Sequence, residues 1–134
     1  MKYLVVSDSH GDRQILVDLV HHFKNKVDYF IHCGDSELPA SDDLWNDFHV
    51  VGGNCDYDFN YKNKQLLATD RDRIFVTHGH LSNVRMGLAN LKMQALEEDA
   101  TIALFGHTHQ IGCEKESDIL FLNPGSISQP RGSL

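Results

Sequence analysis

Five short segments of the chain are built from residue types that bind metal ions, and each of them follows an apolar run. They are Asp8-Ser9-His10, Gly34-Asp35, Gly53-Asn54-Cys55-Asp56, Thr77-His78-Gly79-His80 and Gly106-His107-Thr108-His109. Mixed imidazole and oxygen ligands suit Mn, Fe, Zn, Co or Ni, whereas Ca and Mg prefer oxygen ligands alone. The segments therefore predict a site for two divalent metal ions, with Mn as the first choice, and such sites characteristically hydrolyse phosphate esters.

The apolar runs that precede these segments predict buried β-strands. Continuous apolar stretches occur at residues 3–6, 27–33, 48–51 and 101–105, and the patterns of residues 65–77 and 113–122 are typical of hairpins. Helical patterns cover residues 13–25, with Asp12 as the N-cap, residues 41–47, with Ser41 as the N-cap, and residues 83–99. Because strands and helices alternate early and strands pair late, we expect residues 1–134 to form a single α/β domain with a mixed sheet.

The metal-binding segments share one position relative to these strands. In open α/β sheets, binding sites lie beyond the carboxyl ends of the strands, and each segment lies at such an end, so their side chains can meet in one crevice. The candidate ligands are Asp8, His10, Asp35, Asn54, His78, His107 and His109. Two metals about 3.5–4 Å apart need a shared ligand, for which we choose the carboxylate of Asp35. A water held between the two cations would be hydroxide near neutral pH and would attack phosphorus.

The motifs Asp-x-His, Gly-Asp, Gly-Asn-x-Asp, His-Gly-His and Gly-His-Thr-His, in this order, resemble those of the calcineurin-like metallophosphoesterases. Residues 7–11, 53–56, 106–109 and 123–126 are most similar to the small prokaryotic phosphodiesterase branch of that family. The resemblance covers nearly the whole chain and implies a four-layer αββα sandwich with mixed sheets. It also implies hydrolysis of a small or nucleotide-like phosphodiester. The metal ligands that it implies are Asp8, His10, Asp35 and His109 for one ion, and Asp35, Asn54, His78 and His107 for the other.

The chain departs from the family pattern at two places. Larger members carry a His where this chain has Cys55, and that His is thought to protonate or stabilise the leaving group. A neutral thiol adds no positive charge beside phosphate, so we expect a preference for activated aryl diesters over alkyl monoesters. Family members also continue past the Pro130-Arg131-Gly132 motif into further strands, so we expect the second sheet to be smaller or the C-terminal strands to be missing. An exposed sheet edge left in that way could be covered in a homo-oligomer.

Composition narrows the classes of partner. The formal net charge is −7 and the 12 Lys and Arg residues are scattered, which disfavours a grip on long nucleic acid and favours a small phosphoester substrate. The loops at residues 36–42, 57–64 and 80–85 are expected to contact that substrate. No apolar stretch approaches the ~20 residues that span a bilayer, so no membrane partner is expected. The three cysteines are widely spaced, which favours a reducing, cytoplasmic setting, and we expect Cys33 and Cys113 in the core.

Other polar residues near the motifs have plainer interpretations. We expect His32 and His49 to pack within their strands and Asp56 to fix the backbone of its own loop. His80 either orients a metal ligand or caps a turn, and the sequence favours neither. Ser126 follows a turn glycine, but the metal site already supplies a nucleophile, so we reject it as one.

Two other functions fit the same sequence. A retromer subunit with this fold has lost catalytic competence and serves as a docking surface, so a non-catalytic scaffold is the alternative to an enzyme. All seven ligand positions are filled here, which weighs against such decay. A nuclease would use the same chemistry, but the acidic balance disfavours a long basic groove and leaves only short oligonucleotides as substrates.

Overall fold

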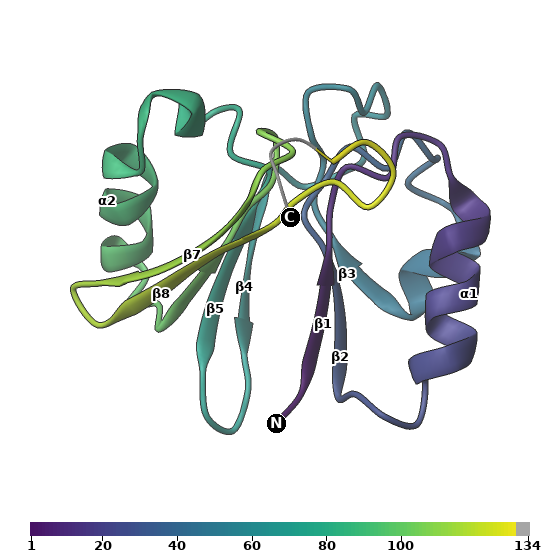
Figure 1. Cartoon of the computed structure of the whole chain (residues 1–134), viewed down its shortest axis with the longest axis horizontal. Helices are drawn as coiled ribbons and strands as arrows, with labels where there is room; N and C mark the ends of the chain where they lie inside the picture. Colours follow the sequence, from purple (N-terminus) through teal and green to yellow (C-terminus); the bar gives the residue numbers. More distant parts are fainter. Residues whose placement is uncertain (131–134) are drawn as a thin grey trace.

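Two β-sheets lie face to face, and one α-helix covers the outer face of each (Figure 1). The computed structural model describes residues 1–130. The first sheet has the order β1 (Tyr3–Val6), β2 (Tyr29–His32) and β3 (Phe48–Val50), all parallel. The second sheet is mixed, in the order β4 (Lys64–Ala68), β5 (Arg73–Thr77), β6 (Ile102–Leu104), β8 (Ile119–Pro124) and β7 (Ile111–Glu116). With α1 (Arg13–Phe23) and α2 (Ala89–Glu97) outside, the predicted αββα sandwich is confirmed.

Three hydrophobic clusters fill the spaces between these four layers. The apolar face of α1, including Leu16 and Val20, packs on Phe30 and Phe48 of the first sheet. Between the sheets, Ile31 meets side chains of the second sheet in a central cluster. The third cluster lies under α2, and its members are Phe75, Val84, Leu91, Ala95, Ala100, Ala103, Phe105, Ile119 and Phe121. Neighbouring residues of one strand therefore belong to different clusters, since successive side chains point to opposite faces of a sheet.

The parallel strands of both sheets bring their carboxyl ends to the same end of the molecule, at the top of Figure 1. The segments that contain Asp8, Asp35 and Asn54 follow the three strands of the first sheet. His78 follows β5, and His107 follows β6 in the second sheet. The two predicted hairpins are the pairs β4–β5 and β7–β8, which are antiparallel as expected.

The helix starts follow local capping chemistry. Asp12 caps α1 as predicted, because its Oδ1 accepts a hydrogen bond of 3.2 Å from the Ile15 amide. The segment predicted at residues 41–47 is a single 3₁₀ turn, η1 (Asp43–Asn46). Its cap is Asp42 rather than Ser41, since the Asp42 carboxylate accepts from the Leu44 amide at 2.9 Å and is also paired with Arg13.

The predicted helix over residues 83–99 is wrong over residues 83–88. That stretch begins as the 3₁₀ turn η2 (Val84–Met86), and α2 starts only at Ala89. Gly87 separates the two with a φ of 128°, which is outside the helical region and accessible to glycine. Leu91 and Ala95 of α2 are buried, whereas Leu96 is 48% exposed.

The burial of two histidines and two cysteines depends on whether each lies at a central strand or at an edge strand of its sheet. His32, on the central strand β2 of the first sheet, and Cys33, directly after that strand, are fully buried, as expected. The prediction that Cys113 lies in the core is wrong: it lies on the edge strand β7, every residue of which is exposed. His49, on the edge strand β3, is also exposed rather than packed, with its ring 5.8 Å from that of Tyr29. Within the described residues, no helix is long and apolar enough to cross a bilayer.

Candidate metal centre

The backbone turns sharply at most of the predicted ligands. Five of the seven have positive φ, which is rare for residues with a side chain: Asp8 (54°), His10 (44°), Asp35 (59°), His107 (72°) and His109 (62°). Each such residue costs of order 1–3 kcal/mol, and strain of this kind gathers at functional sites. These residues lie in the segments that follow β1, β2 and β6, and therefore at the carboxyl ends of those strands.

Asp8 lies at the middle of the resulting cluster. Its side chain is fully buried, and its Oδ2 accepts from the Ser7 hydroxyl at 2.5 Å and from the His107 amide at 3.1 Å. Its Oδ1 is buried with no hydrogen-bond partner among residues 1–130. That oxygen lies 3.3 Å from His109 Nε2 and 3.6 Å from His78 Nε2.

The tautomers of His10 and His109 follow from their other contacts. His10 Nδ1 lies 2.7 Å from Glu37 Oε1, and His109 Nδ1 lies 3.0 Å from the Gln129 carbonyl. Both partners only accept hydrogen bonds, so each Nδ1 carries the proton. The two Nε2 atoms face each other at 3.0 Å, and in neutral rings both present a lone pair. A metal ion that binds both lone pairs would satisfy this arrangement, and so would a proton shared between the two rings.

His78 shows the same arrangement on the other side of Asp8. Its Nδ1 donates to the Cys33 carbonyl at 2.9 Å, which directs its Nε2 toward Asp35 Oδ2 and Asn54 Oδ1, each at 3.1 Å. Burial lowers the pKa of His78, but the hydrogen bond to Asp35 and the charges of Asp8 and Asp35 outweigh it and raise the pKa. A proton on Nε2 and a metal ion would therefore occupy the same position.

The cluster as a whole fits divalent cations. Three groups of three residues have their potential ligand atoms within 4.8 Å of one another: Asp8, His10 and His109; Asp8, Asp35 and His78; and His10, Asp35 and Cys55. Asp8 and Asp35 each belong to two of these groups, so either carboxylate is placed to be shared. Burial raises the pKa of Asp35, but the hydrogen bond and charge of His78 and the Cys55 amide together bring it below its ordinary value, so Asp35 is anionic.

Among the predicted ligands, His107 lies at the edge of the cluster, and its Nε2 contacts a residue outside it. Its ring is 5.1 Å from that of His78, but its Nε2 accepts a hydrogen bond of 3.2 Å from the exposed Arg85 guanidinium. Burial, followed by the charges of His78 and Arg85, lowers the pKa of His107 to about 4, so the ring is neutral at physiological pH. If His107 bound a metal through Nε2, it would lose its hydrogen bond from Arg85. The Arg85 guanidinium would then be free beside the centre.

Close approach of backbone to the carboxylates depends on two glycines. A Cβ at Gly53 would collide with Asp35 Oδ1, and a Cβ at Gly106 would collide with the Ser7 hydroxyl and with Asp8 Oδ2. Because these contacts lie inside the cluster, the Gly-Asn and Gly-His motifs specify glycine for steric reasons.

Cys55 lies at the edge of the cluster. Its amide donates to Asp35 Oδ1 at 2.7 Å, and its side chain is partly buried. Burial and the charge of Asp35 raise the pKa of the Cys55 thiol to about 11. The group is therefore a neutral thiol, which agrees with the expectation that it supplies no positive charge.

Two further polar residues, His80 and Asp56, lie beside the cluster. The His80 ring is 5.3 Å from that of His78, and its Nδ1 is buried with no hydrogen-bond partner in the described part of the chain. Asp56 does fix its loop, as expected, because its Oδ2 accepts from the Gly53 amide at 2.8 Å. It also accepts from the amides of Asp35 and Glu37, each at 2.7 Å, and so joins the loop after β3 to the loop after β2.

Glu37 and Arg85 lie in loops that the sequence analysis expects to contact the substrate, but their contacts with His10 and His107 were not predicted. Glu37 orients His10, and a signal existed: a carboxylate two residues after a predicted ligand in a turn. Arg85 gave no comparable signal. It reaches His107 because Asn83, with a φ of 55°, turns the loop before η2 in a way that local patterns do not specify.

The chain is similar to known phosphoesterases. The family model for the calcineurin-like phosphoesterase superfamily domain matches residues 1–134. A Bacillus subtilis (strain 168) protein described as a probable metallophosphoesterase, YsnB, is 40% identical over 131 residues, which are 98% of this chain and 78% of the relative. The phosphodiesterase YfcE of Escherichia coli (strain K12) is 34% identical over 91 residues, which are 62% of this chain and 46% of that protein.

A solved structure shows the likeness in three dimensions. A conserved protein of Streptococcus pneumoniae TIGR4, described as a predicted phosphoesterase, is 42% identical and superposes with a TM-score of 0.96. The match covers 99% of this chain and 76% of that one. The chain belongs to the calcineurin-like phosphoesterase superfamily.

Proposed function

We propose that this protein is a metal-dependent phosphodiesterase that hydrolyses a small or nucleotide-like phosphodiester. One observation carries the proposal. Asp8 Oδ1 is buried with no hydrogen-bond partner within residues 1–130 and lies 3.3 Å from His109 Nε2 and 3.6 Å from His78 Nε2, and His109 Nε2 lies 3.0 Å from His10 Nε2. Two divalent cations, with Mn as the first choice and Fe, Zn, Ni or Co as alternatives, would supply Lewis acidity and an acidified water. One would be held by Asp8, His10, Asp35 and His109, and the other by Asp35, Asn54, His78 and His107.

The chain's own residues favour a substrate with a good leaving group. Arg85 is exposed beside His107, and its guanidinium can donate to non-bridging oxygens of a phosphoryl group. Cys55 is neutral and a poor proton donor, so a leaving group departs with little help from the protein. Substrates whose leaving groups need no protonation, such as aryl diesters, fit this arrangement best.

Steady-state kinetics with bis(4-nitrophenyl) phosphate and 4-nitrophenyl phosphate tests the proposal. We expect the metal-stripped protein to be inactive, Mn²⁺ to restore turnover, and the diester to be the faster substrate. His109→Ala should lower kcat/KM by at least about 100-fold because it removes a ligand. The matched control His21→Ala removes an exposed imidazole on α1 and should leave kcat/KM unchanged. Turnover that survives exhaustive chelation, or a faster monoester, would contradict the proposal.

The same experiment separates the enzyme from the scaffold alternative. A scaffold would show no metal-dependent turnover with any of the five metals. It would also form a stable complex in pull-down experiments that is unchanged when His107 and His109 are both replaced by Ala.

A further inference from the structure

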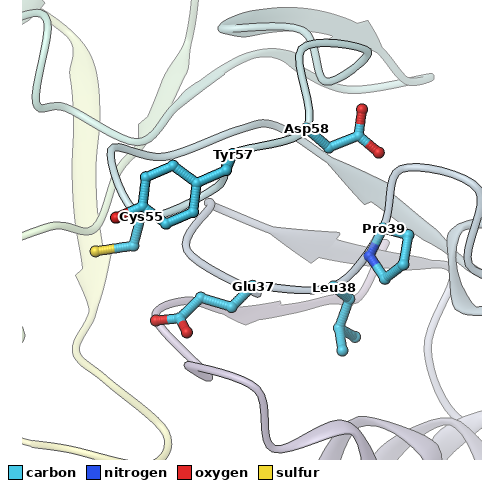
Figure 2. A pocket seen from close by; sticks show the side chains of 6 residues that line it. All are labelled: Glu37, Leu38, Pro39, Cys55, Tyr57 and Asp58. Atoms are coloured by element: carbon cyan, nitrogen blue, oxygen red, sulfur yellow. The ribbon is translucent and has the colours of Figure 1, made fainter.

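A pocket of about 400 Å³ lies between the loop after β2 and the loop after β3 (Figure 2). Its size falls in the range of small-molecule sites. The residues that line it are Glu37, Leu38, Pro39, Cys55, Tyr57 and Asp58. In Figure 2, Cys55 and the Glu37 carboxylate lie at one end of the pocket, and Pro39 and Asp58 lie at the other.

The first end of the pocket opens onto the metal centre. Cys55 Sγ belongs to a group whose ligand atoms, with those of His10 and Asp35, lie within 4.8 Å of one another. Glu37, on the opposite wall, contacts His10 Nδ1 at 2.7 Å. A phosphoryl group held at the centre would therefore have this pocket as a neighbour, within reach of one of its ester groups.

The walls of the pocket are apolar, and both of its ends are acidic. Leu38, Pro39 and the Tyr57 ring supply carbon surface, and none of the six lining residues carries a positive charge. Asp58 is held in place by the amides of Ala40 and Asn60, at 2.8 and 3.0 Å. A second anionic group would be repelled here, whereas a neutral or positively charged ring would meet carbon surface and favourable charge.

The aromatic ring of Tyr57 contributes little to the packing of the fold. Its side chain is 85% exposed and makes no hydrogen bond within residues 1–130. A large exposed ring on the wall of a pocket beside a reactive centre is suited to stacking on a planar ligand.

We propose that this pocket is the subsite for the organic group of the phosphoester, that Tyr57 stacks on that group, and that the subsite selects an aromatic group that is neutral or positively charged. The inference rests on the proposed function, because it assumes that phosphorus binds at the metal centre. It adds where the aromatic group of such an ester binds, a stacking role for Tyr57, and selection against a second anionic group near the ring.

Calorimetric titration of the Mn²⁺-loaded protein with phosphonates tests the subsite without turnover. Each phosphonate carries a single organic group, so there is no second ester group to compete for the pocket. We expect phenylphosphonate to bind about 2- to 12-fold more tightly than methylphosphonate, the range of one aromatic contact. An added carboxylate, in 4-carboxyphenylphosphonate, should weaken binding about 2- to 5-fold relative to phenylphosphonate.

Two variants of the same loop provide the matched comparison. Tyr57→Ala should bring the ratio of phenyl to methyl affinity close to one while leaving methylphosphonate affinity unchanged. Phe59→Ala removes a ring that is fully exposed two residues away and does not line the pocket, so it should keep the wild-type ratio. Both side chains are exposed, so neither variant is expected to impair folding.

The outcomes separate the two proposals. If inorganic phosphate and methylphosphonate bind but phenylphosphonate gains nothing, or if Tyr57→Ala keeps the gain, the subsite is wrong and the proposed function stands. If neither phosphate nor any phosphonate binds the Mn²⁺-loaded protein, the proposed function fails and the subsite fails with it.

Discussion

At the scale of single residues, the candidate centre depends on groups that hold the proposed metal ligands in one orientation. His10, His78 and His109 each engage an acceptor through Nδ1, so that Nε2 is left free to bind a cation. Two of these acceptors are backbone carbonyls, which no substitution removes. The third is the carboxylate of Glu37, which itself has a φ of 57° and is therefore held at a backbone cost.

Replacing Glu37 tests this orienting role. Glu37→Ala should weaken the binding of Mn²⁺ about 10- to 100-fold, because His10 loses the group that fixes its tautomer and ring orientation. Glu37→Gln keeps an oxygen that can accept from Nδ1 and should recover most of that affinity. Titration calorimetry of the metal-stripped protein measures both values, and equal affinities for Ala and Gln variants would argue against orientation through Nδ1.

At the scale of elements, the site is assembled by loops that belong to different strands. The loop after β2 carries Asp35 and Glu37, and the loop after β3 carries Asn54 and Cys55. Strand pairing brings the starts of these loops together, but the loops themselves are joined by Asp56. Its two oxygens accept three backbone amides, from both loops.

Asp56→Ala should therefore destabilise the loops and the fold together. Three amides would lose a charged acceptor, and we expect a loss of about 2–4 kcal/mol in the free energy of unfolding, measured with urea on the metal-free protein. The matched control is Asp47→Ala, at an exposed carboxylate outside these loops, which should change stability by less than about 0.5 kcal/mol. An Asp56 variant as stable as the control would show that strand pairing alone holds the loops.

At the scale of the whole molecule, the protein carries charge that its own groups do not neutralise. The formal net charge is −7, and the carboxylates of Asp8 and Asp35 are both buried within one cluster. Burial raises the pKa of Asp8, and the neighbouring charge of Asp35 raises it further, although His78 acts in the opposite direction. The ionised form of Asp8 is thus disfavoured in the folded chain unless a cation is bound.

Metal binding and Asp8 should consequently have linked effects on stability. Mn²⁺ at 100 times its dissociation constant should add about 2.7 kcal/mol to the free energy of unfolding of the wild-type protein. Asp8→Asn should raise the metal-free stability by about 1–2 kcal/mol and abolish most of the gain from metal, because the buried charge and the ligand are removed together.

Thermal melting with and without Mn²⁺ measures both effects. Asp70→Asn, in the exposed turn between β4 and β5, is the control for the change of charge and should keep the gain from metal. A wild-type melting curve that is identical with and without Mn²⁺ would count against metal binding at this centre.

The sequence by itself determined the α/β architecture and the set of candidate ligands, because both depend on patterns within short stretches of the chain. An apolar run followed by Asp or His specifies a strand and the turn that ends it, and the N-cap Asp12 acts within three residues. Parallel pairing then brings such ends to one side of the molecule, so Asp8, Asp35 and His78 meet as the sequence predicts.

Only the tertiary structure decided which groups surround those ligands and which strands are left at the edges. Glu37 and His10 are 27 residues apart, and Cys113 is exposed because β7 ends its sheet. The split between η2 and α2 depends on the conformation of Gly87, and the pocket beside Tyr57 exists only where two loops meet. These features arise from contacts between distant parts of the chain, which hydrophobic periodicity and capping motifs do not record, because both act over a few neighbouring residues.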